Sequence, residues 1–263
     1  MDSGYRHLPP YYDRWQKSYG KDFSSLIFPK LLATVRSHRI SGRTMVDVAC
    51  GTGTLALMMA RRGWQVTGVD ASEGMLAEAA EKIGSSSLHV ALYRQDMREL
   101  SLPGPVDLAT SFFDSLNHML TAADLGAALR RIRASVVSGG WFIFDTSTER
   151  CFTSLWTKSE TFHERGFSIA LDNSYDRGAR SALCNVTLDV HGEGRTVRLN
   201  ETVRERYYPA EEVAALLEAA AFEVRECEDF NFTSNPAVGK LKTWWVAEAV
   251  DRSATPSSSR QRQ

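Results

Sequence analysis

Long apolar runs are missing from this 263-residue sequence, and the N-terminus carries no cationic segment followed by an apolar one. We therefore expect neither a membrane span nor a signal peptide. Cysteine is scarce: the four cysteines are far apart and form no CxxC pair. Without an export signal, we expect them to be reduced thiols and the protein to be cytoplasmic.

Neither sign of charge is in excess, because 31 Lys and Arg face 32 Asp and Glu, for a net charge of −1. Proteins that bind nucleic-acid phosphates usually carry a basic excess or stripe, so we expect no nucleic-acid partner. The six histidines show no HxxxH or HExxH spacing. No metal site is therefore expected.

Apolar segments alternate between strand-like and helix-like patterns over residues 41–148. The predicted strands are 44–49, 65–69, 88–93, 106–113 and 140–145, and the predicted helices are 54–62, 72–83 and 121–137. Strands alternating with helices of this length indicate βαβ units and a parallel sheet. We therefore predict an α/β fold, with a mostly parallel, Rossmann-like sheet and helices on both faces.

Other segments flank or interrupt this core. Residues 1–40 are expected to form an irregular arm followed by a helix that begins near residue 22. Residues 149–207 contain period-two segments and glycine-rich turns, which predict an inserted antiparallel β meander, interpreted as a substrate lid. Residues 208–250 resume the α/β core, and 251–263 are polar and aperiodic, as in a disordered tail.

A glycine loop joins the first predicted strand to the helix that follows. Glycines at such a turn let the backbone approach a ligand and expose amides at a helix N-terminus. Gly51-x-Gly53-x-x-Ala56 fits the dinucleotide fingerprint G-x-G-x-x-G/A. A tight strand–helix turn without a ligand would show the same glycines, so the loop alone leaves both interpretations open.

Acidic residues accompany the ends of three successive predicted strands. Asp47 lies in the first strand, Asp70 ends the second, and Asp96 ends the third. Singly, Asp70 could cap a helix and Asp96 could stabilise a turn. Because open α/β sheets bind ligands at the carboxyl ends of their strands, and an acid at the position of Asp70 accepts hydrogen bonds from ribose hydroxyls, the three together predict a nucleoside site.

These motifs resemble those of the class I S-adenosylmethionine-dependent methyltransferases. The resemblance rests on VDVACGTGTLA at 46–56, GVDAS at 68–72, RQDM at 94–97 and PVDLATSFFDSLNHM at 105–119. It covers about 40–148 and 208–250, and Asp47, four residues before the first glycine, is typical of the family. The β insertion and SFFDSLNH also resemble a bacterial small-molecule subgroup that includes aminosugar and glycine-type N-methyltransferases.

The resemblance implies how the chain would hold S-adenosylmethionine and its product S-adenosylhomocysteine. Backbone around Ala49, Gly51 and Gly53 would hold the methionine part, and Asp70 would bind the ribose diol. The cofactor has no phosphates, and the loop GTGTLA accordingly has no basic residue. The remaining implied contacts are Asp96 and the Met97 amide to the adenine, Met75, Phe112 and Phe113 against the adenine or the methionine arm, and Tyr12 closing over the cofactor.

The segment after the fourth strand would face the transferred methyl group. His118 is the first candidate for a general base or substrate orienter, because its unperturbed pKa lies near 6.5. Asp114 is the second candidate. Both have a structural alternative, since His118 could pack against the next helix and Asp114 could cap a turn.

Two other functions compete with the expected methyl transfer to N or O of a small molecule. A nicotinamide (NAD(P)-dependent) oxidoreductase of the short-chain type needs Tyr-x-x-x-Lys, and no tyrosine here has a lysine four residues on. Nucleic-acid amino-methyltransferases carry Asn/Asp-Pro-Pro-Tyr where residues 113–116 read FDSL. A protein or RNA acceptor remains the alternative within the class, and the oligomeric state, monomer or homodimer, stays open.

Overall fold

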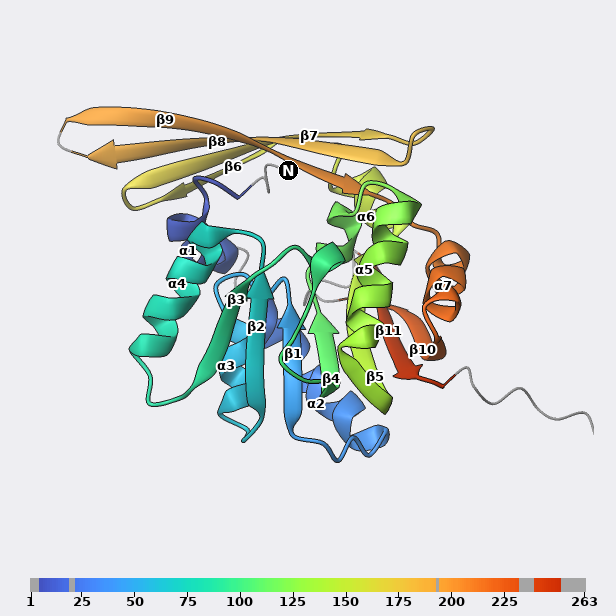
Figure 1. The fold of residues 1–263 in the computed structure, drawn as a ribbon. Coiled ribbons are helices and arrows are strands. Elements are labelled where there is room, and N and C mark those ends of the chain that lie inside the picture. The colour runs from blue at the N-terminus through green and yellow to red at the C-terminus, as the bar shows by residue number, and fades with distance from the viewer. Residues whose placement is uncertain (1–4, 19–21, 193, 232–238, 252–263) are drawn as a thin grey trace, which may run out of the picture.

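A seven-stranded core sheet and a separate four-stranded antiparallel sheet make up the fold (Figure 1). The computed structural model describes residues 5–18, 22–192, 194–231 and 239–251. The strand order of the core sheet is β10-β11-β5-β4-β1-β2-β3. Strands β1 to β5 pair in parallel, whereas β11 runs antiparallel to both β5 and β10. The predicted α/β class with a mostly parallel sheet is confirmed.

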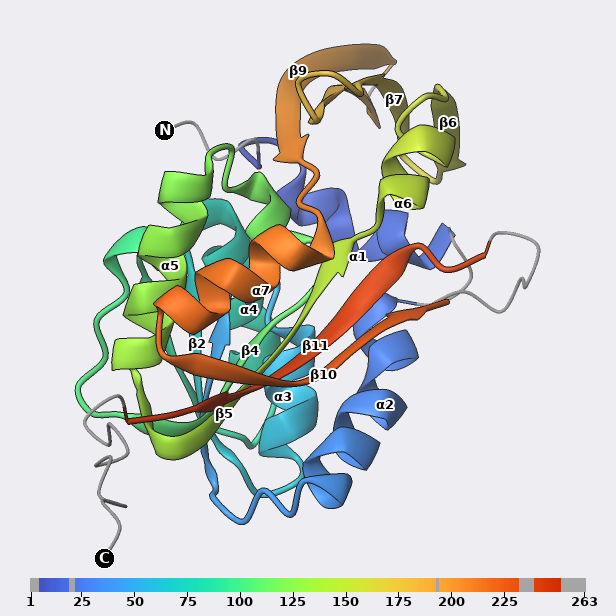
Figure 2. The ribbon, with the colours of Figure 1, turned by 90° about the vertical axis from the view of Figure 1, so that its right-hand side faces the viewer.

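The core strands are β1 Thr44–Val48, β2 Gln65–Asp70, β3 Val90–Arg94, β4 Val106–Ser111, β5 Val136–Ser147, β10 Phe222–Phe230 and β11 Lys242–Ala249. The helices around them are α2 Phe23–Ser37, α3 Thr54–Ala60, α4 Glu73–Gly84, α5 Ala122–Ala134 and α7 Ala210–Ala219. Helices α2 and α3 lie on one face of the sheet, and α5 and α7 lie on the other (Figure 2). Their apolar side chains pack against the sheet in two separate core clusters. Both faces are thereby buried.

Side-chain caps fix where several of these helices begin. Asp22, Ser72 and Thr121 each accept a hydrogen bond from the backbone amide three residues on. Such caps satisfy amides that the first helical turn leaves without partners. Each helix therefore starts within a residue or two of its expected position.

The N-terminal segment differs from the irregular arm that we expected, because Pro9–Ser18 forms helix α1. Two prolines open this helix, where their missing amide hydrogens cost nothing. Its aromatic side chains, including Tyr11 and Trp15, pack against the second sheet. Burial against a distant part of the chain stabilises this short helix, and local sequence does not show it.

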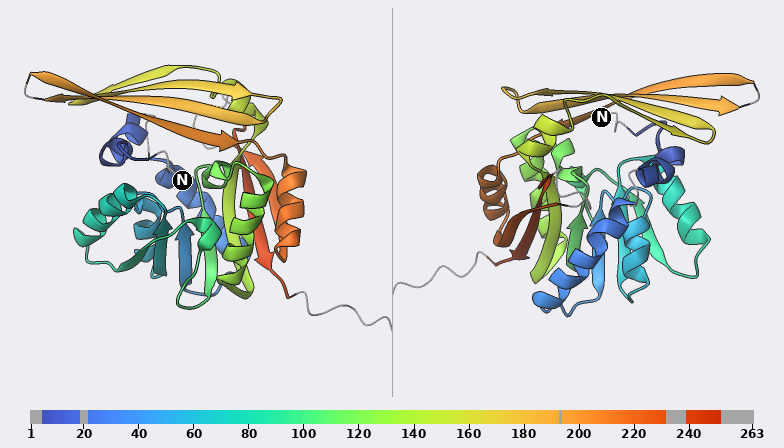
Figure 3. Two further views of the ribbon diagram at one scale, coloured as in Figure 1. Left: turned by 45° about the horizontal axis from the view of Figure 1, so that its top comes forward. Right: turned by 180° about the vertical axis from the view of Figure 1, so that it is seen from behind.

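The second sheet is the insertion predicted from period-two patterning. A short helix, α6 (Glu149–Ser154), leads into strands β6 Glu160–Glu164, β7 Phe167–Asp176, β8 Ser181–Gly192 and β9 Arg195–Arg206, which pair in that order. Alternate residues such as Ile169, Val186 and Val203 are buried against α1. The sheet lies across the carboxyl ends of the parallel strands, with α1 between it and the core (Figure 3).

The predicted disordered tail lies outside the described residues, apart from Asp251. Among the described residues, no helix is both long enough and apolar enough to cross a membrane.

Candidate active site

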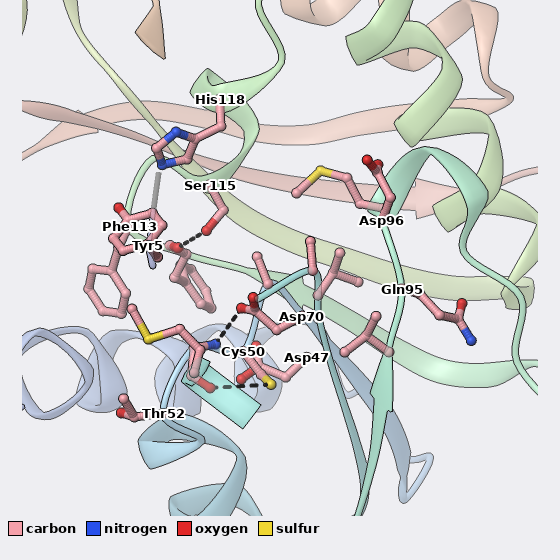
Figure 4. A pocket seen from close by; sticks show the side chains of 18 of the residues that line it. Tyr5, Asp47, Cys50, Thr52, Asp70, Gln95, Asp96, Phe113, Ser115 and His118 are labelled. Atoms are coloured by element: carbon pink, nitrogen blue, oxygen red, sulfur yellow. Dashed lines mark hydrogen bonds between the residues drawn. The ribbon is translucent and has the colours of Figure 1, made fainter. Parts of the chain in front are cut away.

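A cavity of about 370 Å³ opens between the carboxyl ends of the parallel strands, α1 and the second sheet (Figure 4). Ten of the twelve predicted site residues line it: Tyr12, Ala49, Gly51, Asp70, Met75, Asp96, Met97, Phe112, Phe113 and His118. Gly53 and Asp114 are not among the lining residues. The structure therefore brings together most of a site whose members span more than a hundred positions of sequence.

The glycine loop, residues 49–54, forms one wall of this cavity. Gly51 has φ +53°, and a Cβ added there would meet nothing within 4 Å, so the backbone is open to a ligand. Gly53 has φ +73° and caps α3, and its absent side chain lets Ala79 of α4 approach to 3.1 Å of where a Cβ would stand. Gly53 thus serves the packing of α3 against α4, whereas Gly51 faces the cavity.

Asp70 ties the loop to the end of β2. Its Oδ2 accepts a hydrogen bond from the Gly51 amide and its Oδ1 accepts one from the Ser72 amide, both at 2.8 Å. Burial raises the pKa of the Asp70 carboxyl, although these backbone amides oppose the shift. Each oxygen keeps lone-pair capacity toward the cavity, so the carboxyl can accept further hydrogen bonds from a ligand.

Asp47 adds a second buried acid beneath the loop. The Thr110 hydroxyl donates to its Oδ1 at 2.7 Å, yet burial raises the pKa of Asp47 to about 7. No Lys or Arg stands in residues 46–56 to offset this acid. The wall formed by Asp47 and Asp70 is therefore suited to a cationic ligand rather than to phosphate.

Asp96 differs, because its carboxylate already has a partner. Its Oδ1 accepts from Nε of Arg98 at 2.9 Å, and Arg98 also reaches Oδ1 of Asp124 at 2.9 Å. The Arg98 guanidinium holds the pKa of Asp96 below its usual value. Asp96 is thus ionised at neutral pH, and any ligand at this end of the cavity meets a carboxylate held rigid by Arg98.

The segment after β4 follows an unusual backbone path. Phe113 and Asp114 both have positive φ, 63° and 55°, a conformation that costs residues other than glycine roughly 1–2 kcal/mol each. The Asp145 carboxylate accepts both amides, from Phe113 at 3.1 Å and from Asp114 at 2.8 Å. This path turns the Asp114 side chain away from the cavity, where its Oδ2 pairs with Nζ of Lys242 at 2.7 Å and accepts from Ser147 Oγ at 3.0 Å.

The ion pair sets the protonation of Asp114. Burial alone would raise the pKa of Asp114, but the Lys242 ammonium holds it below its usual value. Asp114 is therefore a carboxylate whose Oδ2 is already engaged by Lys242 and Ser147. The sequence placed Asp114 at the reacting atoms, whereas the structure places it behind the wall that carries Phe113 and His118.

His118 ends the short 3₁₀ helix η2 (Ser115–His118) and lines the cavity above Tyr5 and Phe113 (Figure 4). Its Nδ1 lies 3.1 Å from the carbonyl oxygen of Arg204 on β9. Because a carbonyl only accepts, Nδ1 carries the hydrogen and Nε2 keeps a lone pair. Burial lowers the pKa of His118, so the ring is neutral at physiological pH and can accept a proton.

Helix α1 closes the cavity on the side of the glycine loop. Tyr12 lines the cavity, and Asp13 accepts a hydrogen bond from Thr52 Oγ1 at 2.6 Å. The other oxygen of Asp13 pairs with Nζ of Lys82 on α4 at 2.6 Å. The sequence analysis did not predict these interactions of Asp13, because it did not predict helix α1.

The glycine loop, the acids at successive strand ends and the cavity over that edge are the arrangement expected of a Rossmann-like fold with a nucleoside site. Comparison with known proteins agrees. Residues 45–140 match the family model described as a methyltransferase domain. The chain is 29% identical over 197 residues to a putative methyltransferase, YqeM, of Bacillus subtilis, covering 73% of this chain and 79% of that one.

Two further relatives extend the comparison. The dTDP-3-amino-3,4,6-trideoxy-alpha-D-glucopyranose N,N-dimethyltransferase of Streptomyces venezuelae is 26% identical, covering 71% of this chain and 77% of that one. An S-adenosylmethionine-dependent methyltransferase structure from Clostridium acetobutylicum shares the fold with a TM-score of 0.75, at 21% identity, covering 87% of this chain and 91% of that one. Residues 45–140 thus match the methyltransferase domain family, and the relatives and the shared fold support an S-adenosylmethionine-dependent methyltransferase.

The residues present fit this cofactor. S-adenosylmethionine carries positive charge on its sulfonium and amino groups and none of the phosphates of a dinucleotide. Asp47 and Asp70 offer acids whose pKa values are raised by burial, and a bound cation would favour their ionised forms. The open backbone at Gly51 leaves room for the methionine part of the cofactor.

Proposed function

We propose that the protein methylates a nitrogen or oxygen atom of a small-molecule acceptor that binds between His118 and the second sheet. The observation that carries this proposal is that one cavity spans both regions, since Asp70 and Gly51 line it together with His118 and Thr202 of β9. The cofactor region accounts for one end, and the end near His118 is free for an acceptor. The second sheet is then the cover of the acceptor subsite.

The relatives suggest the acceptor to try first. A dTDP-3-amino-3,6-dideoxy-alpha-D-glucopyranose N,N-dimethyltransferase of Streptomyces fradiae is 35% identical over 129 residues, about half of each chain. An aminosugar nucleotide of this kind is therefore our first candidate. A ubiquinone biosynthesis O-methyltransferase is 35% identical over 122 residues, so oxygen stays within the proposal, as does a protein or RNA acceptor as an alternative.

We assign the cofactor contacts as follows. Backbone at Ala49 and Gly51 holds the methionine part, with Asp47 as the counter-charge for its amino group. Asp70 accepts from the ribose hydroxyls, and Asp96 with the Met97 amide contacts the adenine. We assign the apolar and aromatic contacts to the cofactor to four residues: Met75, Phe112, Phe113 and Tyr12. All these assignments are supported by the position of the residues in the lining of one cavity.

Bound S-adenosylmethionine supplies a methyl group that its sulfonium already activates. The chain's own work is alignment and exclusion of water, which contribute on the order of 7–11 kcal/mol in well-oriented reactions. Helix α1 and the second sheet cover the cavity, and the rigid segment around Phe113 fixes the position of His118. His118 Nε2 accepts a hydrogen bond from the acceptor and takes its proton when the nucleophile is a hydroxyl.

The proposal also includes where in the cell the protein works. We propose a cytoplasmic protein, supported by four cysteines that are all unpaired.

Calorimetry with the purified protein should show saturable binding of S-adenosylhomocysteine and no binding of NADH. The physical reason is that the pyrophosphate of NADH would meet the buried acids Asp47 and Asp70 with no basic residue on the loop. The second readout is methyl incorporation into the aminosugar nucleotide. Saturable NADH binding without S-adenosylhomocysteine binding would overturn the proposed function.

Affinity for S-adenosylhomocysteine should rise as the pH increases through 7. Burial raises the pKa of Asp47 to about 7, so part of the population is protonated at neutral pH. A bound ammonium group favours the ionised carboxyl, so binding releases a proton below that pKa and strengthens as the pH rises through it. Titrations from pH 5.5 to 8.5 should show this slope, and Asp47→Asn should flatten it. An equal slope in the variant would assign the pH dependence to another group.

A further inference from the structure

A buried carboxyl group, Glu205 on β9, lies beside the proposed acceptor subsite and has no role in the cofactor contacts. The residue is only 4% exposed. Its Oε1 lies 4.0 Å from Nε2 of His118, and its Oε2 has no hydrogen-bond partner among the described residues. Since His118 itself lines the cavity, Glu205 stands one side chain behind the cavity wall.

Such a carboxyl is costly to bury, because folding strips it of water and provides no full set of partners in exchange. The Lys242 ammonium group, which acts on Glu205 electrostatically, lies 2.7 Å from Asp114 and donates to the Ser147 hydroxyl at 3.0 Å. Among the described residues, the ion-pair contact of Glu205 is with His118 at 4.0 Å, and the Lys242 ammonium offsets the burial of Glu205 only in part. Burial accordingly raises the pKa of Glu205 well above its usual value.

A cation placed next to His118 would relieve this cost, and methyl transfer to an amine creates one there. As the nitrogen lone pair forms a bond to the methyl carbon, the carbon–sulfur bond breaks and its electron pair stays on sulfur. The positive charge therefore passes from sulfur to nitrogen, and one proton of the methylated ammonium then leaves to His118 Nε2 or to water. Transfer to a hydroxyl ends instead as a neutral ether, which needs no lasting counter-charge.

We propose that Glu205 is a positioning residue that provides the counter-charge for an amino group bound at His118, so that the acceptor of this enzyme is an amine. The inference rests on the proposed function and narrows its acceptor from nitrogen or oxygen to nitrogen. Glu205 acts across His118, whose orientation is fixed by the Arg204 carbonyl at 3.1 Å. A preorganised charge aimed at the place where charge develops stabilises the transition state without reorganisation.

Sinefungin allows a test that needs no known acceptor. This analogue carries an amino group on the carbon that replaces the sulfur of the cofactor, close to where the methyl acceptor binds, whereas S-adenosylhomocysteine is neutral at that atom. The two ligands share every other group, so the ratio of their affinities isolates the added ammonium. Calorimetry should compare the wild type with Glu205→Gln and with Glu201→Gln. Glu201 is the matched control, because it lies on the same strand and face but accepts hydrogen bonds from the amides of Arg6 and His7.

Glu205→Gln should weaken sinefungin about tenfold or more, as loss of an interaction between charged groups does, and should leave S-adenosylhomocysteine within about twofold. Glu201→Gln should leave both affinities unchanged. In the wild type, the preference for sinefungin should grow between pH 6 and 8.5 as bound ammonium favours ionised Glu205, and in Glu205→Gln this growth should be lost. The wild type and Glu205→Gln share all other titratable groups near Glu205, so a difference between their pH profiles reports Glu205 itself. These shared groups are Tyr5, Asp114, His118, Asp145, Cys151, Cys184 and Lys242.

An unchanged affinity ratio and pH profile in a folded Glu205→Gln protein would overturn the inference while leaving the proposed function intact. Equal weakening of both ligands would also overturn it, because it would show a structural role. Failure of the wild type to bind S-adenosylhomocysteine would instead overturn the proposed function, and with it this inference.

Discussion

Replacing Lys242 with methionine is expected to lower the free energy of unfolding by about 3–5 kcal/mol, the usual cost of removing one partner from a buried ion pair. Lys242 is 5% exposed and neutralises Asp114, while the Asp145 carboxyl is buried close by. Methionine fills a similar volume, so the loss reports charge and not a cavity. At roughly 2–4 °C per kcal/mol for a chain of this size, the melting temperature should fall by about 6–20 °C.

Two variants check this interpretation. Lys158→Met makes the same substitution at an exposed position and should change stability by less than about 0.5 kcal/mol. Adding Asp114→Asn to Lys242→Met should recover part of the loss, since it removes the carboxylate left without a partner. A Lys242→Met protein as stable as the wild type would mean that the buried acids are neutral in the native state.

Asp70→Ala is expected to weaken S-adenosylhomocysteine about a hundredfold in a protein that stays folded. A hydrogen bond to a charged acceptor is worth about 1.5–3 kcal/mol, and the substitution removes both the proposed ribose contact and the carboxylate that holds the Gly51 amide. Calorimetry gives the affinity, and circular dichroism with a melting curve shows that the variant is folded.

The control for Asp70→Ala is Glu73→Ala. Glu73 lies at the start of α4, pairs with Arg94 at the surface and has a side chain that is 80% exposed. Its loss removes one negative charge from the same neighbourhood and should leave binding within about twofold. If folded Asp70→Ala binds like the wild type, Asp70 serves only to shape the turn between β2 and α4.

The sequence allowed prediction of the parts of the site that follow from strand order. Parallel strands bring their carboxyl ends to one edge, so Gly51, Asp70 and Asp96 could be grouped before their positions were known. The same reasoning placed His118 in the segment after β4. These residues line one cavity in the structure, whereas their individual roles remain predictions until they are measured.

Other parts of the site have no local signature. Lys242 is brought near the site by the antiparallel pairing of β11 with β5, and Glu205 by the return of β9 over the core. Residue spacing does not reveal either arrangement. Asp114 was predicted to face the methyl group because it lies in the segment after β4. The prediction of the segment was correct, but the backbone conformation at Asp114 could not be foreseen from the sequence. Two successive positive φ angles, at Phe113 and Asp114, reverse the direction of its side chain.

Helix α1 contacts two walls of the cavity at once. Its Asp13 carboxylate accepts a hydrogen bond from the Thr52 hydroxyl of the glycine loop. Its Tyr11 ring packs on Phe167 of the second sheet, with ring centroids 4.8 Å apart. The helix therefore connects the glycine loop, where we propose that the cofactor binds, with the second sheet, which we propose covers the acceptor. A movement that opens one end of the cavity would disturb the contacts at the other end, so we expect release of the spent cofactor and entry of the next acceptor to be coupled through α1.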